Sequence, residues 1–106
     1  MQINPAAVLV LQCGTPVELP FIKQTSTVVQ AWYGGQELGN AIADVLFGDV
    51  NPSAKLPLSW PKGVQDNPAY LNFGRSDKGG VTYGEGVFAG WKWYEALQIS
   101  PEFPFG

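Results

Sequence analysis

The sequence predicts an α/β fold: part of an α/β sandwich with a short, mostly parallel sheet, one helix and an irregular C-terminal tail rich in aromatic residues. Two short apolar runs have the composition of buried strands, and a segment after them has apolar residues at helical spacing. Beyond residue 50 the prolines are too closely spaced for a long helix. We therefore expect residues 1–62 to form the α/β core and residues 63–106 an extended tail of the same domain.

The first expected strand covers residues 7–11 (AVLVL), a continuous apolar run of the kind buried in parallel sheets. Gly14-Thr15-Pro16 ends it, and residues 17–24 leave room for about one turn of helix. Residues 27–32 (TVVQAW) are rich in β-branched side chains and predict a second buried strand. The roughly 15 residues between the two runs suffice for a right-handed crossover between parallel strands.

The expected helix follows Gly34-Gly35. Its apolar residues recur at i, i+3, i+4, i+7 and i+8 and form one stripe for burial: Leu38, Ala41, Ile42, Val45 and Leu46. Glu37 in the first turn favours the helix dipole, and Gly48 supplies the C-terminal stop. Since Gly34-Gly35 lacks both the G-x-G-x-x-G spacing and a P-loop lysine, we interpret it as a tight turn and not as a nucleotide site.

The last part of the chain is expected to be irregular. Residues 55–60 (KLPLSW) suit an edge strand, because Pro57 cannot donate to a ladder. Residues 75–80 (RSDKGG) predict an exposed loop, and residues 81–94 mix aromatic side chains with three glycines, which indicates an extended or hairpin segment.

Composition is that of an ordinary globular chain, with 45% hydrophobic residues and a formal net charge of −3. Nine acidic and six basic residues leave no basic patch, which argues against nucleic acid as a partner. No apolar run approaches about 20 residues, so no membrane span is expected. The start lacks the pattern of a signal peptide, and the sequence assigns no compartment.

Metal and cofactor chemistry is not expected. The chain has no histidine and a single cysteine, Cys13, so a Cys-His pair, a Ser-His-Asp triad and the usual zinc ligand sets are all excluded. The carboxylates do not cluster at ligand spacing. Cys13 follows an apolar strand and is interpreted as a small residue at the strand end.

Residues 31–61, AWYGGQELGNAIADVLFGDVNPSAKLPLSWP, carry a longer pattern. This run resembles part of the second domain of glycoside hydrolase family 3, the retaining β-glucosidases, and is most similar to fungal and yeast members. The likeness extends over most of the chain through four further segments: Val8–Pro20 (VLVLQCGTPVELP), Asp66–Phe73 (DNPAYLNF), Tyr83–Tyr94 (YGEGVFAGWKWY) and Phe103–Gly106 (FPFG).

The resemblance implies a parent enzyme that hydrolyses terminal β-D-glucosides. A retaining glycosidase needs two carboxyl groups roughly 5 Å apart. In this family the nucleophilic aspartate lies on a separate (β/α)₈ barrel, and the acid/base glutamate lies upstream of the strand that Val8 to Leu11 match. We therefore expect no catalytic carboxylate here, an inactive isolated chain, and a role as scaffold and interface. The implied partners are the missing barrel, a β-glucoside or oligosaccharide in the parent enzyme, and a second copy through self-association; parents in this family are often secreted.

A few residues remain candidates for a site. The aromatic side chains of Tyr83, Trp91 and Trp93 suit stacking on a sugar, although aromatic residues more often lock a segment onto a core. Glu85 is the first catalytic candidate if the chain is active alone. The alternative function is therefore a small stand-alone carbohydrate-binding protein, or a minimal β-glucosidase that uses its own Asp and Glu residues.

Overall fold

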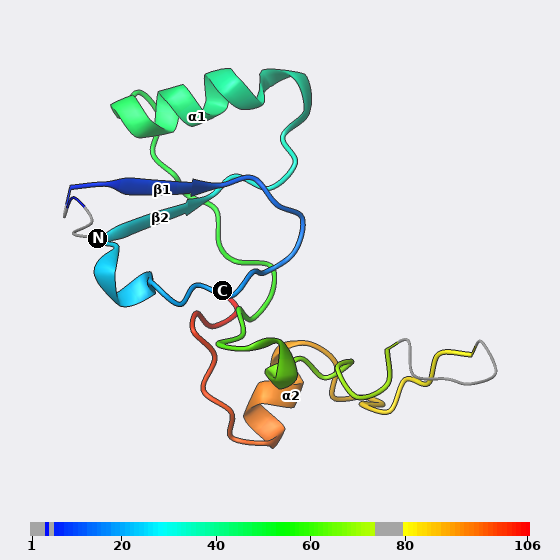
Figure 1. Ribbon diagram of the computed structural model, residues 1–106. Helices are drawn as coiled ribbons and strands as arrows, with labels where there is room; N and C mark the ends of the chain where they lie inside the picture. The colour runs from blue at the N-terminus through cyan, green and yellow to red at the C-terminus, as the bar shows by residue number, and fades with distance from the viewer. Residues whose placement is uncertain (1–3, 5, 74–79) are drawn as a thin grey trace. The chain divides into compact units, whose positions relative to one another are not determined.

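The computed structural model describes residues 4, 6–73 and 80–106, which form two compact units, Met1–Ala54 and Lys55–Gly106 (Figure 1). The first unit contains a sheet and a helix, as the predicted α/β class requires. The second is built from turns, a short helix and a returning C-terminal segment. The exposed loop expected over residues 75–80 lies, apart from Gly80, outside the described residues.

The sheet of the first unit has two parallel strands, β1 (Val8–Leu11) and β2 (Thr27–Gln30), with Val8 opposite Thr27 and Leu11 opposite Gln30. Both expected strands and their parallel pairing are confirmed. The second strand ends two residues early, because Trp32 has a φ of 53° and leaves the extended conformation. The connection contains a 3₁₀ turn at Ile22–Gln24, where about one helical turn was expected.

The strands are less buried than the sequence predicts. Val8 is 46% exposed, and the other residues of β1 are only half-buried. The expectation of a strand buried on both faces is wrong for this chain. The physical reason is that a central parallel strand needs a neighbour on each side, and the described residues supply each strand with one neighbour only.

Helix α1 spans Leu38–Phe47 and follows a 3₁₀ turn at Gly35–Glu37 (Figure 1). Gly48 ends it with a φ of 86°, and the amides of Asp49 and Val50 both donate to the Asp44 carbonyl, at 2.8 and 3.1 Å. The predicted helix and its glycine stop are therefore confirmed. Among the described residues, no helix is long and apolar enough to cross a membrane.

The apolar stripe of α1 is only partly covered. Leu38, Ile42 and Val45 are half-buried, whereas Ala41 is exposed and Leu46 is 44% exposed. The expectation that the whole stripe is buried is thus wrong in this chain, because a two-stranded sheet is too narrow to cover a stripe of that width.

The second unit is centred on Trp60 and Tyr94, which are 2% and 5% exposed. The Trp60 amide donates to the Phe103 carbonyl and the Glu102 amide donates to the Trp60 carbonyl, both at 2.8 Å. The edge strand expected over residues 55–60 is thereby reduced to one antiparallel bridge. The prolines at 57 and 61 explain this, because neither can donate the amide that a longer ladder needs.

Helix α2, Trp91–Ala96, corrects the extended or hairpin segment expected up to residue 94. Gly90, with a φ of 61°, makes the turn into the helix, and the six residues that follow contain neither glycine nor proline. The helix ends at Ala96 with Leu97 as its C-cap, and the next residue, Gln98, has a φ of 54°. The Ile99 amide closes this end by donating to the Tyr94 carbonyl at 2.8 Å.

Candidate functional site

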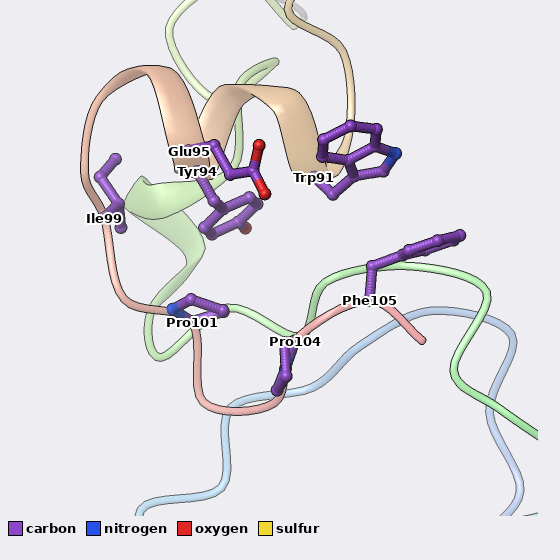
Figure 2. A pocket seen from close by; sticks show the side chains of 7 residues that line it. All are labelled: Trp91, Tyr94, Glu95, Ile99, Pro101, Pro104 and Phe105. Carbon is purple, nitrogen blue, oxygen red and sulfur yellow. The ribbon is translucent and has the colours of Figure 1, made fainter.

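An open cavity of about 450 Å³ lies between α2 and the C-terminal segment of the second unit (Figure 2). Its lining is mostly apolar and comes from Trp91, Tyr94, Glu95, Ile99, Pro101, Pro104 and Phe105. The ring of Trp91 stacks on the ring of Phe105, with centroids 6.3 Å apart and planes inclined by 26°. An aromatic pair therefore forms one side of the cavity.

Two polar groups accompany this apolar lining. Glu95 is exposed and, in Figure 2, directs its carboxylate toward the side of the cavity where Trp91 lies. Burial raises the pKa of the Tyr94 phenol, and the negative charge of Asp66 raises it further. The phenol therefore stays neutral at ordinary pH, so the cavity combines aromatic faces, a neutral phenol and one carboxylate.

A second open cavity, of about 480 Å³, borders α2 as well. It is lined by Val87, Phe88, Trp91, Lys92, Glu95 and Ala96. The Lys92 ammonium lies 6.0 Å from the centroid of the Trp91 ring, at the outer limit of a cation–π contact. Trp91 and Glu95 line both cavities, which makes these two residues the centre of the candidate site.

The three aromatic candidates from the sequence are not gathered in these cavities. Trp91, 40% exposed, lines both of them, whereas Tyr83, 79% exposed, and the half-buried Trp93 line neither. Glu95 and Phe105 were missed. The spacing of Trp91 and Glu95, i and i+4, would have placed both on one helical face, but only if residues 91–96 had been predicted as a helix.

Glu85 lies in a turn and lines neither of these two cavities. The Gly86 amide donates to the Tyr83 carbonyl at 3.2 Å, and the Phe88 amide donates to the Glu85 carbonyl at 3.1 Å. Within the part of the chain that the structure describes, its Oε2 atom is buried and has no hydrogen-bond partner. Among the same residues, no three His, Cys, Asp or Glu side chains are arranged to hold a metal ion.

Known β-glucosidases match this chain along its length. "Probable beta-glucosidase I" of Aspergillus clavatus and "Beta-glucosidase" of Kluyveromyces marxianus are each 58% identical to it over 106 residues. Each alignment covers 100% of this chain and 12% of the relative. The chain therefore spans about an eighth of the length of these relatives.

Solved structures agree with the sequence matches. The Kluyveromyces marxianus β-glucosidase, crystallised in complex with glucose, superposes with a TM-score of 0.91 at 59% identity, over 96% of this chain and 12% of that one. β-Glucosidase 3B of Thermotoga neapolitana gives a TM-score of 0.84 at 32% identity, over 92% and 14%. The family described as the glycosyl hydrolase family 3 C-terminal domain matches residues 1–91. The resemblance noted in the sequence is thus confirmed, and the chain belongs to the glycosyl hydrolase family 3 C-terminal domain family.

Proposed function

We propose that this chain is the scaffold and interface portion of a retaining β-glucosidase that hydrolyses terminal β-D-glucosides, and that it contributes neither catalytic carboxylate. The observation that carries the proposal is the 12% share of the matched β-glucosidases, combined with 58% identity over the whole chain. A retaining glycosidase needs a nucleophile and an acid/base about 5 Å apart. In this proposal, the nucleophile comes from the barrel and the acid/base from the part of the second domain upstream of Val8.

Exposed apolar side chains support an interface role. In the first unit Phe47 is 85% exposed, and in the second unit Leu71 and Phe73 are 66% and 74% exposed. Exposed apolar side chains mark contacts with another protein when they form a continuous surface, and the proposal assigns these three side chains to such contacts. The stripe of α1 is half-covered, and among the described residues each strand has one neighbour. Both observations also support an interface role, because further layers of a larger α/β domain would cover such elements.

A host chimera tests the proposal. The host chimera is the Kluyveromyces marxianus β-glucosidase in which residues 1–106 of the present chain replace the matching segment. We expect the purified 106-residue chain to release no aryl alcohol from an aryl β-glucoside, and the host chimera to hydrolyse it. Turnover by the isolated chain that disappears in Glu85→Gln would instead support the minimal β-glucosidase.

Self-association belongs to the same proposal. Strands with unpaired edges invite pairing with another chain, and exposed apolar side chains add to the attraction. We expect light scattering of the isolated chain to give a mass that rises with concentration. A strict monomer at high concentration that binds no hydrophobic dye would favour the stand-alone alternative.

One observation favours carbohydrate contact as a second function. Trp91 presents a 40% exposed indole to a cavity that also contains the Glu95 carboxylate, and sugars are commonly bound by an aromatic face together with a hydrogen-bond acceptor. If this holds, Trp91→Ala abolishes the binding of cellobiose to the isolated chain in calorimetry. Tyr83→Ala is the matched control, since Tyr83 lines neither cavity; equal affinities in all three proteins would exclude the site.

A further inference from the structure

We propose that Tyr33 is a specificity-determining residue of the β-glucosidase: its aromatic ring contacts the leaving group of the bound β-glucoside. The inference rests on the proposed function and adds one contact between this chain and the substrate. The bond-breaking steps stay with the two carboxyl groups outside the chain.

The first observation is the place of Tyr33 at the carboxyl end of the sheet. The strands β1 and β2 are parallel, and their arrows point the same way in Figure 1, so the loops that follow them leave from one edge. Tyr33 closely follows β2 and is 80% exposed. In open α/β sheets, ligands bind outside the carboxyl ends of the strands. The exposed ring therefore lies at the edge where domains of this class bind small molecules.

The second observation is the strained backbone directly before this ring. Trp32 has a φ of 53°, a left-handed conformation that is rare for a bulky residue. Such strain persists only where surrounding contacts impose it, and it is concentrated at functional sites. Here the Ala31 amide donates to the Leu11 carbonyl at 2.8 Å, and Gln30 Nε2 donates to the Cys13 carbonyl at 2.6 Å. These hydrogen bonds hold the end of β2 to the end of β1, next to the strained residue.

The third observation is the support of the ring. A Cβ atom at Gly14, in the loop after β1, would overlap the ring of Tyr33, so the ring lies directly against the Gly14 backbone. Part of the ring thus contacts the chain, while most of the side chain stays exposed. A ring that is already positioned loses little freedom on binding, so it offers a preorganised aromatic face to a ligand.

The proposed function selects the leaving group as that ligand. In a retaining glycosidase the two carboxyl groups flank the scissile bond, and the acid/base protonates the oxygen of the leaving group. In the proposed enzyme, the acid/base comes from the same domain as Tyr33, whereas the nucleophile comes from the barrel. The leaving group therefore faces the domain of Tyr33. An aromatic face at this position suits an aryl group or a second glucose as the leaving group.

The first test is steady-state kinetics of the host chimera with an aryl β-glucoside and with cellobiose. Tyr33→Ala should raise the KM of both substrates about 3- to 10-fold, as expected for the loss of one aromatic contact, and leave kcat unchanged. The inhibition constant of glucose, which has no leaving group, should stay at the parental value. Tyr33→Phe keeps the ring and should restore the parental KM. Tyr83→Ala is the matched control, because Tyr83 is 79% exposed but lies in the second unit, and it should change neither constant.

Nitration by tetranitromethane, measured at Tyr33 by peptide mass spectrometry, is a second test that needs no variant. Tyr33 of the host chimera should be nitrated. Phenyl 1-thio-β-glucoside, which keeps an aryl group but resists hydrolysis, should protect Tyr33 several-fold better than glucose does.

Three results in an active chimera overturn this inference alone. They are an unchanged KM in Tyr33→Ala, protection by glucose equal to that by the thioglucoside, and a Tyr33 that is unreactive without ligand. The last result would mean that the rest of the enzyme packs over the ring. A chimera that is folded but inactive, or that does not fold, overturns the proposed function and this inference with it.

Discussion

Trp91 opens α2 and stacks on Phe105, the penultimate residue of the chain, with 6.3 Å between their ring centroids. The pair joins the helix to the C-terminal segment at one side of the main cavity. The same segment is also bonded to residues 56 and 60, because the Gly106 amide donates to the Leu56 carbonyl at 3.1 Å and Trp60 pairs with Phe103. The stacking therefore ties α2 to an already anchored strip of backbone.

Phe105→Ala should accordingly destabilise the second unit. Aromatic pairs contribute about 0.5–1.5 kcal/mol beyond the area that they bury. A double-mutant cycle with Trp91→Ala, measured by urea unfolding, should return a coupling energy of about that size. Phe47→Ala is the control, since a side chain that is 85% exposed should change stability little. Zero coupling between Trp91 and Phe105 would contradict the stacked arrangement.

The raised pKa of Tyr94 predicts that the folded chain loses stability at alkaline pH. Its pKa is raised in the folded chain, first by burial and then by the negative charge of Asp66. Above about pH 10 the unfolded phenol loses its proton while the folded one keeps it, so stability falls with rising pH until the folded pKa is passed. The stabilising effect of the neutral phenol is fully present below that range.

Tyr94→Phe removes this titration, so the variant should lose less stability between about pH 9 and 11 than the parent chain does. The measurement is the urea midpoint at each pH. Tyr83→Phe is the matched control because that side chain is 79% exposed, and its urea midpoint should fall with pH as steeply as that of the parent chain. A Tyr94→Phe variant with the parental slope would show that the buried phenol is not the source.

Gln98→Gly should stabilise the chain. Gln98 follows the C-cap of α2 with a φ of 54°, and the left-handed conformation costs a residue with a side chain about 1–2 kcal/mol. Glycine relieves that strain and should raise the unfolding midpoint. The gain in stability should be smaller than the strain energy, because glycine also makes the unfolded state more flexible. Gln98→Ala keeps the strain and should show no gain. Equal midpoints for the glycine and alanine variants would mean that this backbone is unstrained.

Local patterns in the sequence were sufficient for the regular elements of the first unit. The continuous apolar run predicts β1, the β-branched run predicts β2, and the apolar spacing with Gly48 predicts α1 and its end, because each signal is contained in neighbouring residues. Burial could not be predicted in the same way. Whether Leu46 is covered depends on how many strands lie beneath the helix, and the spacing of its own segment does not contain that information.

In the second unit, local sequence patterns were not sufficient to predict the helix α2. Residues 91–96 (WKWYEA) mix aromatic and polar side chains between a glycine-rich turn and Pro101, so local propensity does not separate a short helix from an extended segment. The helix is instead fixed by tertiary contacts, since Tyr94 is buried and Trp91 stacks on Phe105, well beyond the end of the helix. The cavity at Trp91 could not be found without that helix, and Phe105 and Glu95 were missed for the same reason.

The helix α1 provides the last prediction. In the isolated chain, Ile42→Ala should destabilise more than Leu46→Ala, because Ile42 is half-buried whereas Leu46 is 44% exposed. In the host chimera, the proposed scaffold role requires the rest of the domain to cover the stripe, so Leu46→Ala should then approach the roughly 2–5 kcal/mol typical of a buried leucine. Asp44→Ala, on the polar face, should stay within about 0.5 kcal/mol in both proteins. Urea midpoints decide the matter: a large effect of Leu46→Ala already in the isolated chain contradicts its exposure. A small effect in both proteins means that nothing in the enzyme packs on this side of α1.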